Sequence, residues 1–71
     1  MQNLNEEICL AVIPVDDGYL SFTTKTTYLA FMKNSQTRPS DDADILLILK
    51  GGNSTIVKPS TINQMSWIMN Q

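Results

Sequence analysis

The sequence predicts a small α+β domain in which two β-hairpins are each followed by a short helix, giving the order ββαββα. Two observations support this. Two largely apolar segments each precede a glycine-containing turn and a second extended segment. A short stretch with helical spacing of apolar residues follows each pair. We expect an antiparallel sheet with both helices on one face, in a single domain spanning residues 1–71, with ββα units at about 7–34 and 44–70 and a connector at 35–43.

The first hairpin is predicted from alternation of side chains around a turn. Residues 8–15 are apolar at nearly every position, and Asp16-Asp17-Gly18 supplies turn residues. Residues 19–23 then alternate, so that Leu20 and Phe22 face one side of the sheet. A helix follows, because apolar residues recur there at helical spacing, with Thr26 or Thr27 as possible N-caps and Asn34 at its end: Tyr28, Leu29, Phe31 and Met32.

The segment from Ser40 to Lys50 is compatible with two structures. In the helical alternative, Ser40 is the N-cap, three aspartates occupy the first turn and Gly51 ends the helix. In the hairpin alternative, which we favour, Gly51-Gly52-Asn53 forms the turn, and β-branched residues 55–57 belong to the returning strand. The five consecutive apolar residues 45–49 are typical of a central strand covered on both faces.

The last predicted element is a C-terminal helix after Pro59, with Thr61 and Gln64 as a capping box. Its apolar face would carry four residues at helical spacing: Ile62, Met65, Ile68 and Met69. Trp67 lies off the centre of this face and is expected to be partly exposed. The alternative fold is a small all-β barrel with a C-terminal helix, in which one strand runs unbroken through residues 19–32.

The composition argues against an enzyme and against a metal or cofactor site. Histidine is absent, which removes the usual general base and every catalytic triad that uses it. Cys9 is the only cysteine, so neither an internal disulfide nor a structural zinc set can form. Because Cys9 lies within an apolar segment, we expect it to be buried and slow to react. The aspartates at 41, 42 and 44 follow no metal-loop spacing, and we expect no cofactor.

The charge and length of the chain restrict its partners and location. The net charge of −2 argues against a nucleic-acid partner, because proteins that bind nucleic acid normally have a basic face. No segment reaches the 18 apolar residues of a membrane span, and acidic Glu6 and Glu7 precede the apolar N-terminal run where a signal peptide carries cations. We therefore expect a cytoplasmic protein without a membrane partner. A chain this short buries a small core, so self-association as a dimer is also expected.

These observations favour a non-catalytic protein-interaction module that regulates or inhibits a macromolecular partner, as small accessory proteins of bacteria, phages or plasmids do. The alternative is a nucleic-acid-binding regulator of transcription or replication that uses a β-ribbon. Tryptophan and methionine are common where proteins bind one another. The candidate partner-binding residues are therefore the apolar ones of the two predicted helices: Trp67, Ile68, Met65, Met69 and Phe31.

Overall fold

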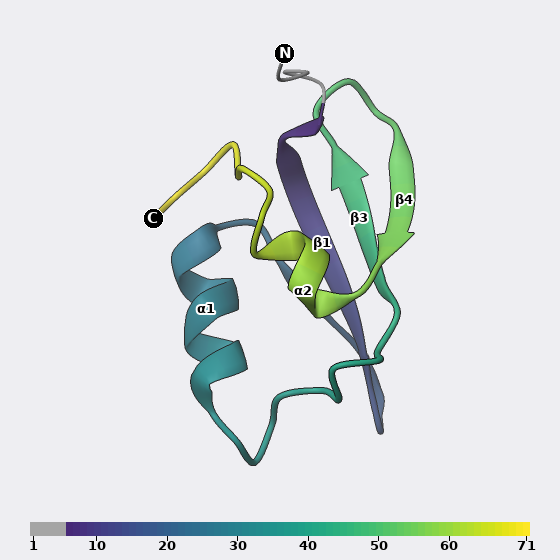
Figure 1. Ribbon diagram of the computed structural model, residues 1–71, viewed down its shortest axis with the longest axis vertical. Helices are drawn as coiled ribbons and strands as arrows, with labels where there is room; N and C mark the ends of the chain where they lie inside the picture. The colour runs from purple at the N-terminus through teal and green to yellow at the C-terminus, as the bar shows by residue number, and fades with distance from the viewer. Residues whose placement is uncertain (1–5) are drawn as a thin grey trace.

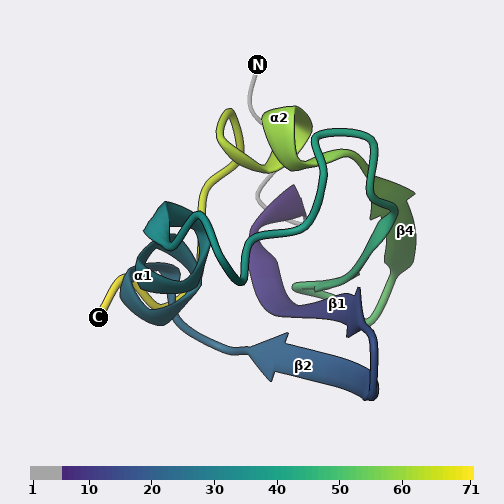
Figure 2. The same cartoon turned by 90° about the horizontal axis from the view of Figure 1, so that it is seen from below.

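The computed structural model, which describes residues 6–71, confirms the predicted α+β fold class and the order ββαββα. The four strands form an open antiparallel sheet, and both helices lie on one of its faces (Figures 1 and 2). Because the sheet does not close, the alternative of an all-β barrel is wrong. The elements are β1 (Ile8–Val15), β2 (Gly18–Phe22), α1 (Lys25–Lys33), β3 (Ile45–Leu49), β4 (Ser54–Val57) and α2 (Pro59–Ile62).

The strand order β2-β1-β3-β4 places the two longest apolar segments, β1 and β3, in the centre of the sheet. β2 and β4 pair with them as hairpins and form the two edges. The hairpin prediction for the segment after Ser40 is confirmed, and the helical alternative is wrong. Gly51 and Gly52 adopt φ angles of 96° and 90° in the β3–β4 turn, a region that L side chains seldom occupy. Asn53, the third residue of the predicted turn, does not have a positive φ.

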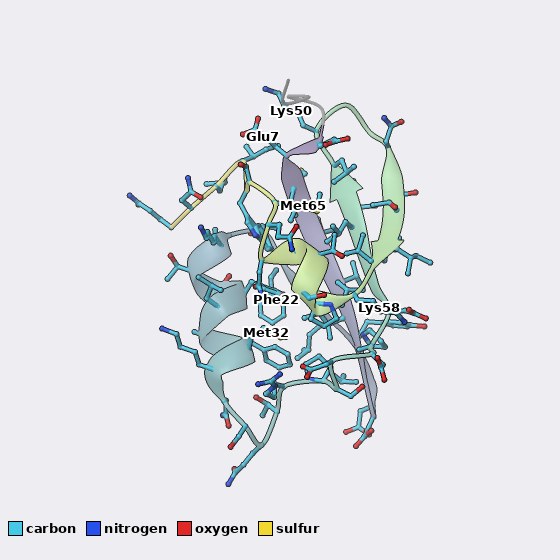
Figure 3. The ribbon with its side chains drawn as sticks, viewed as in Figure 1. Glu7, Phe22, Met32, Lys50, Lys58 and Met65 are labelled. Carbon is cyan, nitrogen blue, oxygen red and sulfur yellow. The ribbon has the colours of Figure 1, made fainter. Side chains whose placement is uncertain are left out.

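The core lies between the sheet and the two helices. β1 and β3 contribute alternate residues, α1 contributes Tyr28, and α2 contributes Ile62. Tyr28 packs against Trp67 with ring centroids 5.3 Å apart, and against the edge of Phe22 at 6.2 Å. The buried apolar residues are Ile8, Ala11, Ile13, Tyr28, Ile45, Leu47, Leu49, Ile62 and Trp67. Figure 3 shows Phe22, Met32 and Met65, which pack around this core from three different segments.

The N-cap of helix α1 lies two or three residues before the predicted ones. Its N-cap is Thr24 rather than Thr26 or Thr27, and the Thr24 hydroxyl oxygen accepts a hydrogen bond from the backbone amide of Thr27 at 3.3 Å. Asn34 ends the helix, as predicted, with its amide donating to the carbonyl of Phe31. Thr24 is favoured because its extended backbone leaves β2 directly and its hydroxyl reaches the free amides of the first turn.

The predicted C-terminal helix is wrong beyond its first turn. α2 ends at Ile62, and its N-cap is Lys58 without a side-chain capping bond, so the Thr61–Gln64 capping box does not form. The chain instead becomes extended and runs beside the start of β1, where the Ile8 amide donates to the Ser66 carbonyl at 2.8 Å. The Ile68 amide in turn donates to the Ile8 carbonyl at 3.0 Å. These bonds satisfy the backbone amide and carbonyl of Ile8, which have no partner on β2 because β2 pairs only with residues 11–15 of β1.

The segment after α2, residues 63–71, which we call the tail, also contacts the first turn of α1. The Lys25 amide donates to the Met69 carbonyl at 2.9 Å, and the Thr26 hydroxyl donates to the Asn70 carbonyl at 2.6 Å.

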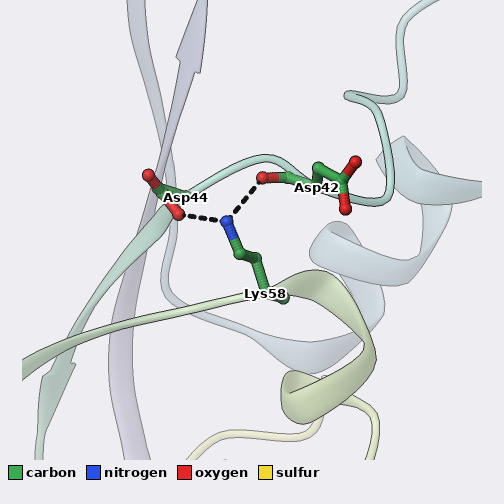
Figure 4. A network of polar contacts seen from close by, with 3 residues as sticks. All are labelled: Asp42, Asp44 and Lys58. Atoms are coloured by element: carbon green, nitrogen blue, oxygen red, sulfur yellow. Dashed lines mark hydrogen bonds and ion pairs between the residues drawn. The ribbon is translucent and has the colours of Figure 1, made fainter.

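On the other side of the molecule, Lys58 at the end of β4 binds the segment that precedes β3. Its Nζ donates to Asp44 Oδ1 at 2.6 Å and to the Asp42 carbonyl at 2.8 Å (Figure 4).

The expectation that Cys9 is buried is also wrong. The β1–β3 register shifts by one residue between Ile8 and Leu10, which marks a β-bulge at Cys9. Ile8 and Ala11 are three positions apart, so in a regular strand their side chains would point to opposite faces of the sheet. The bulge lets both side chains point into the core. Cys9 is the extra residue of the bulge, and its side chain is exposed.

Candidate functional site

The strand register assigns each side chain of the sheet to one of its two faces. Ala11 and Ile13 of β1 face the helices and are buried, as are Ile45, Leu47 and Leu49 of β3. Side chains alternate along a strand, so the residues between these, and their direct cross-strand partners, point to the other face. No helix of residues 6–71 covers that face (Figure 2). We call it the open sheet face, and its large apolar residues are Leu10, Val12, Tyr19, Leu46, Ile48 and Ile56.

A continuous row of side chains crosses the open sheet face in register. Val12 on β1 pairs with Ser21 on β2 and with Leu46 on β3, and Leu46 pairs with Ile56 on β4. The exposed fractions of Leu46 and Ile56 are 37% and 65%, and that of Tyr19 near one corner is 75%. Cross-strand neighbours lie about 5 Å apart, so the three aliphatic side chains of the row form one contiguous patch.

None of the residues within the four strands is charged, so the open sheet face has no charge between its strand ends. All five basic and seven acidic residues of the chain lie outside the four strands, in turns, in the connector, on α1 or beside strand ends. An antiparallel sheet with one face in water ordinarily alternates apolar residues inside with polar residues outside. Here β3, with the sequence ILLIL, is apolar on both sides although α1 and α2 cover only one. The sequence-based expectation that both faces of this strand are covered is therefore wrong for the single chain.

The residues predicted to bind a partner are not gathered on one surface. Trp67 is 3% exposed and belongs to the core, so the expectation that it is partly accessible is wrong. Its burial follows from the extended tail, which turns its side chain toward Tyr28. Met65 and Phe31 are half-buried against the core. Ile68 and Met69 are 42% and 56% exposed and lie beside the N-terminus of α1, away from the open sheet face.

Phe31 also contributes to a shallow hollow of about 440 Å³ between the β1–β2 turn and the connector after α1. Leu20 and Pro39 are among its apolar lining residues, and Asp16, Asp17 and Arg38 among its polar ones. Arg38 donates to Asp41 at 2.7 Å, so its charge is already paired. The hollow is open and its charges of both signs are exposed, which provides no specific binding chemistry.

The described part of the chain offers little reactive chemistry. Among residues 6–71, no three His, Cys, Asp or Glu side chains gather closely enough to hold a metal ion. The Tyr28 hydroxyl is buried without a hydrogen-bond partner, and its burial raises the pKa of that hydroxyl above the usual 10.0. Raising this pKa keeps the phenol neutral, which is unsuited to nucleophilic or general-base work.

Comparison with known proteins adds no relative: no family model, no curated protein and no solved structure matches the chain. None of the helices in residues 6–71 has the length and apolar character needed to cross a bilayer.

The sequence contains a signal for this face. Taken alone, five consecutive apolar residues such as those of β3 predict burial on both sides. Combined with helices on one face only, the same pattern indicates an apolar surface that water contacts. Apolar Leu10 and Val12 at the outward positions of β1 carry the same information.

Proposed function

We propose that this protein is a non-catalytic protein-interaction module that regulates or inhibits a macromolecular partner, and that it binds through the open sheet face. The observation that carries the proposal is the uncharged apolar row Val12–Leu46–Ile56 on an uncovered sheet. Contiguous exposed apolar patches on small proteins commonly serve binding. The side chains project from paired strands, so their positions are set before a partner arrives, which lowers the entropy cost of binding.

The charge distribution favours a protein partner over nucleic acid. A β-ribbon or sheet that contacts phosphates needs Lys or Arg on its surface, and the four strands carry neither. Tyr19 is the single aromatic side chain on the open sheet face, which offers a poor stacking platform for bases. The exposed lone thiol of Cys9 is compatible with a reducing compartment, which supports placing this activity in the cytoplasm.

The test compares capture of partners by three forms of the tagged chain in a lysate of the source cells. Wild-type protein is compared with Ile56→Lys, which places a charge on the open sheet face, and with Ile68→Lys, which changes the same residue type at an exposed site elsewhere. We expect a specific protein to be captured by wild type and Ile68→Lys but not by Ile56→Lys. Capture that depends on Ile68 instead would refute the proposed surface.

A parallel titration with DNA and RNA addresses the nucleic-acid alternative. Phosphate contacts make affinity fall steeply with salt concentration, whereas burial of apolar surface does not. We expect no salt-dependent nucleic-acid binding by the wild-type chain. Tight binding that weakens by orders of magnitude between low and physiological salt would contradict the proposal.

A further inference from the structure

The two central strands have the sequences of strands buried on both sides. β3 is apolar at all five positions, and β1 is apolar from Ile8 to Val15. The helices cover Ala11, Ile13, Ile45 and Leu47. No helix of residues 6–71 covers the outward residues between them, of which Leu46 is exposed and Val12 half-buried. A strand with this pattern is ordinarily found between two layers. The missing element is therefore a second layer over the open sheet face.

The shape and charge of the open sheet face fit another sheet of the same kind. Two sheets pack face to face at a separation of about 10 Å, with their strands rotated by about 30° and their side chains interdigitated. The rows Val12–Leu46–Ile56 and Leu10–Ile48 supply such ridges. Because the four strands carry no charged residue, packing two copies over their strands places no like charges opposite each other, and the Lys58–Asp44 ion pair lies beside the strand ends.

The area of the face determines how tight such an association can be. Four strands spaced about 4.8 Å apart, each with about five residues rising about 3.3 Å, give a face of roughly 300 Å² in projection. A standard interface buries about 800 Å² on each partner, so this face can form only the apolar centre of an interface. The polar strand ends must supply the rim. We therefore expect a reversible dimer, with dissociation in the micromolar range rather than an obligate one.

From these observations we infer that the open sheet face packs against the same face of a second copy, giving a two-fold dimer with the sheets inside and the helices outside. The inference rests on the proposed function, since both use the open sheet face, and a second copy occupies that face in place of any other partner. A two-fold arrangement is the common form for identical chains and places each outward residue in the interface twice. It also supplies the additional buried surface that a 71-residue chain without an internal disulfide lacks.

A competing arrangement of two copies would pair the free edges of β4. Its sequence, STIV, has no charge or proline to discourage pairing with another strand. Edge pairing would extend the sheet and leave both open faces uncovered. Because Ile56 lies on β4 itself, Ile56→Lys would discourage edge pairing as well as face packing. Leu46 is on the same face but on the central strand β3, so Leu46→Lys distinguishes face packing from edge pairing.

The experiment is sedimentation velocity on the full chain, from about 1 µM to about 1 mM, the range in which a small interface dissociates. Ile56→Lys introduces a charge at the most exposed aliphatic side chain of the open sheet face, and Ile68→Lys is the matched control outside it. Ile56→Thr preserves β-branching if the lysine variant does not fold. Circular dichroism verifies folding. We expect a concentration-dependent dimer that Ile56→Lys weakens by about 30-fold, as for a binding hot spot.

The following outcomes separate the inference from the proposed function. A dimer weakened by Leu46→Lys as well as by Ile56→Lys, and unchanged within about twofold by Ile68→Lys, supports the inference. A dimer weakened by Ile56→Lys but not by Leu46→Lys is paired through the β4 edges and overturns it. A wild-type monomer throughout the concentration range, or a dimer insensitive to Ile56, overturns it. If the wild type is monomeric while Ile56→Lys still abolishes capture of a different protein, the proposed function stands without the second copy. If capture is also insensitive to Ile56, both fail.

Discussion

Replacing Trp67 with alanine should remove a large part of the stability of this domain. The side chain is 3% exposed and packs on Tyr28 with ring centroids 5.3 Å apart. A buried Trp→Ala change costs about 3–5 kcal/mol, because the transfer energy of the ring is lost and a cavity remains. Proteins are stable by about 0.05–0.15 kcal/mol per residue, which for 71 residues is about 4–11 kcal/mol. The substitution therefore removes between about a third and all of the unfolding free energy.

The assay is urea unfolding followed by far-UV circular dichroism, because the variant has lost the only tryptophan. Small proteins lose about 1 kcal/mol of unfolding free energy per molar urea, so the midpoint should fall by about 3 M or more. Met69→Ala is the control: this neighbouring apolar side chain is 56% exposed and should change stability by less than about 0.5 kcal/mol. Low protein concentration keeps self-association out of the measurement.

A midpoint that falls by less than about 1 M in Trp67→Ala would refute the placement of Trp67 in the core. Acrylamide quenching of wild-type fluorescence provides an independent reading. We expect strong protection of the indole at a concentration at which the chain is monomeric. Efficient quenching under those conditions would mean that the tail from Asn63 to Gln71 does not pack on β1 as described.

Further predictions concern three single side chains, Tyr28, Cys9 and Thr24. Tyr28→Phe removes a buried hydroxyl without a partner and should raise the unfolding free energy by about 1 kcal/mol; a loss of that size in urea unfolding would contradict the description. Burial raises the pKa of Tyr28 above 10.0, so the unfolded chain releases this proton first and stability falls as pH rises above 10.0; melting temperatures in that range should depend less on pH in Tyr28→Phe. Cys9 should react with a thiol reagent in the native state nearly as fast as in urea, and slow labelling would argue against the bulge. Thr24→Ala should cost about 1 kcal/mol through loss of the N-cap of α1, whereas Thr24→Ser should retain most of the stability.

The hairpins could be predicted from the sequence because local signals and tertiary structure agree there. Alternation around Leu20 and Phe22, and the β-branched residues of β4 after a Gly-Gly turn, indicate the same structure as the observed register. The C-terminal segment differs. Ile62, Met65, Ile68 and Met69 have helical spacing, but a longer helix would leave the backbone of Ile8 unpaired and Trp67 outside the core.

The errors at Cys9 and at the candidate site have related causes. A bulge shifts the side-chain alternation by one position, and the apolar sequence around Cys9 contains no local signal for it. The bulge depends on the pairing of β1 with β3, which is distant in sequence. The open sheet face could have been anticipated from outward residues such as Leu46 and Ile48, but only after the helices had been assigned to a single face.

The most direct test of the open sheet face as the interaction surface is NMR of the methyl groups in the presence of a soluble paramagnetic probe, at low and high protein concentration. At low concentration, the methyls of Leu46, Ile56 and Ile68 should all be accessible to the probe, in keeping with their exposure. At high concentration, we predict that Leu46 and Ile56 become protected while Ile68 remains accessible. Protection of Ile68 with Ile56 still accessible, or unchanged accessibility of all three at every concentration, would contradict the second copy on the open sheet face.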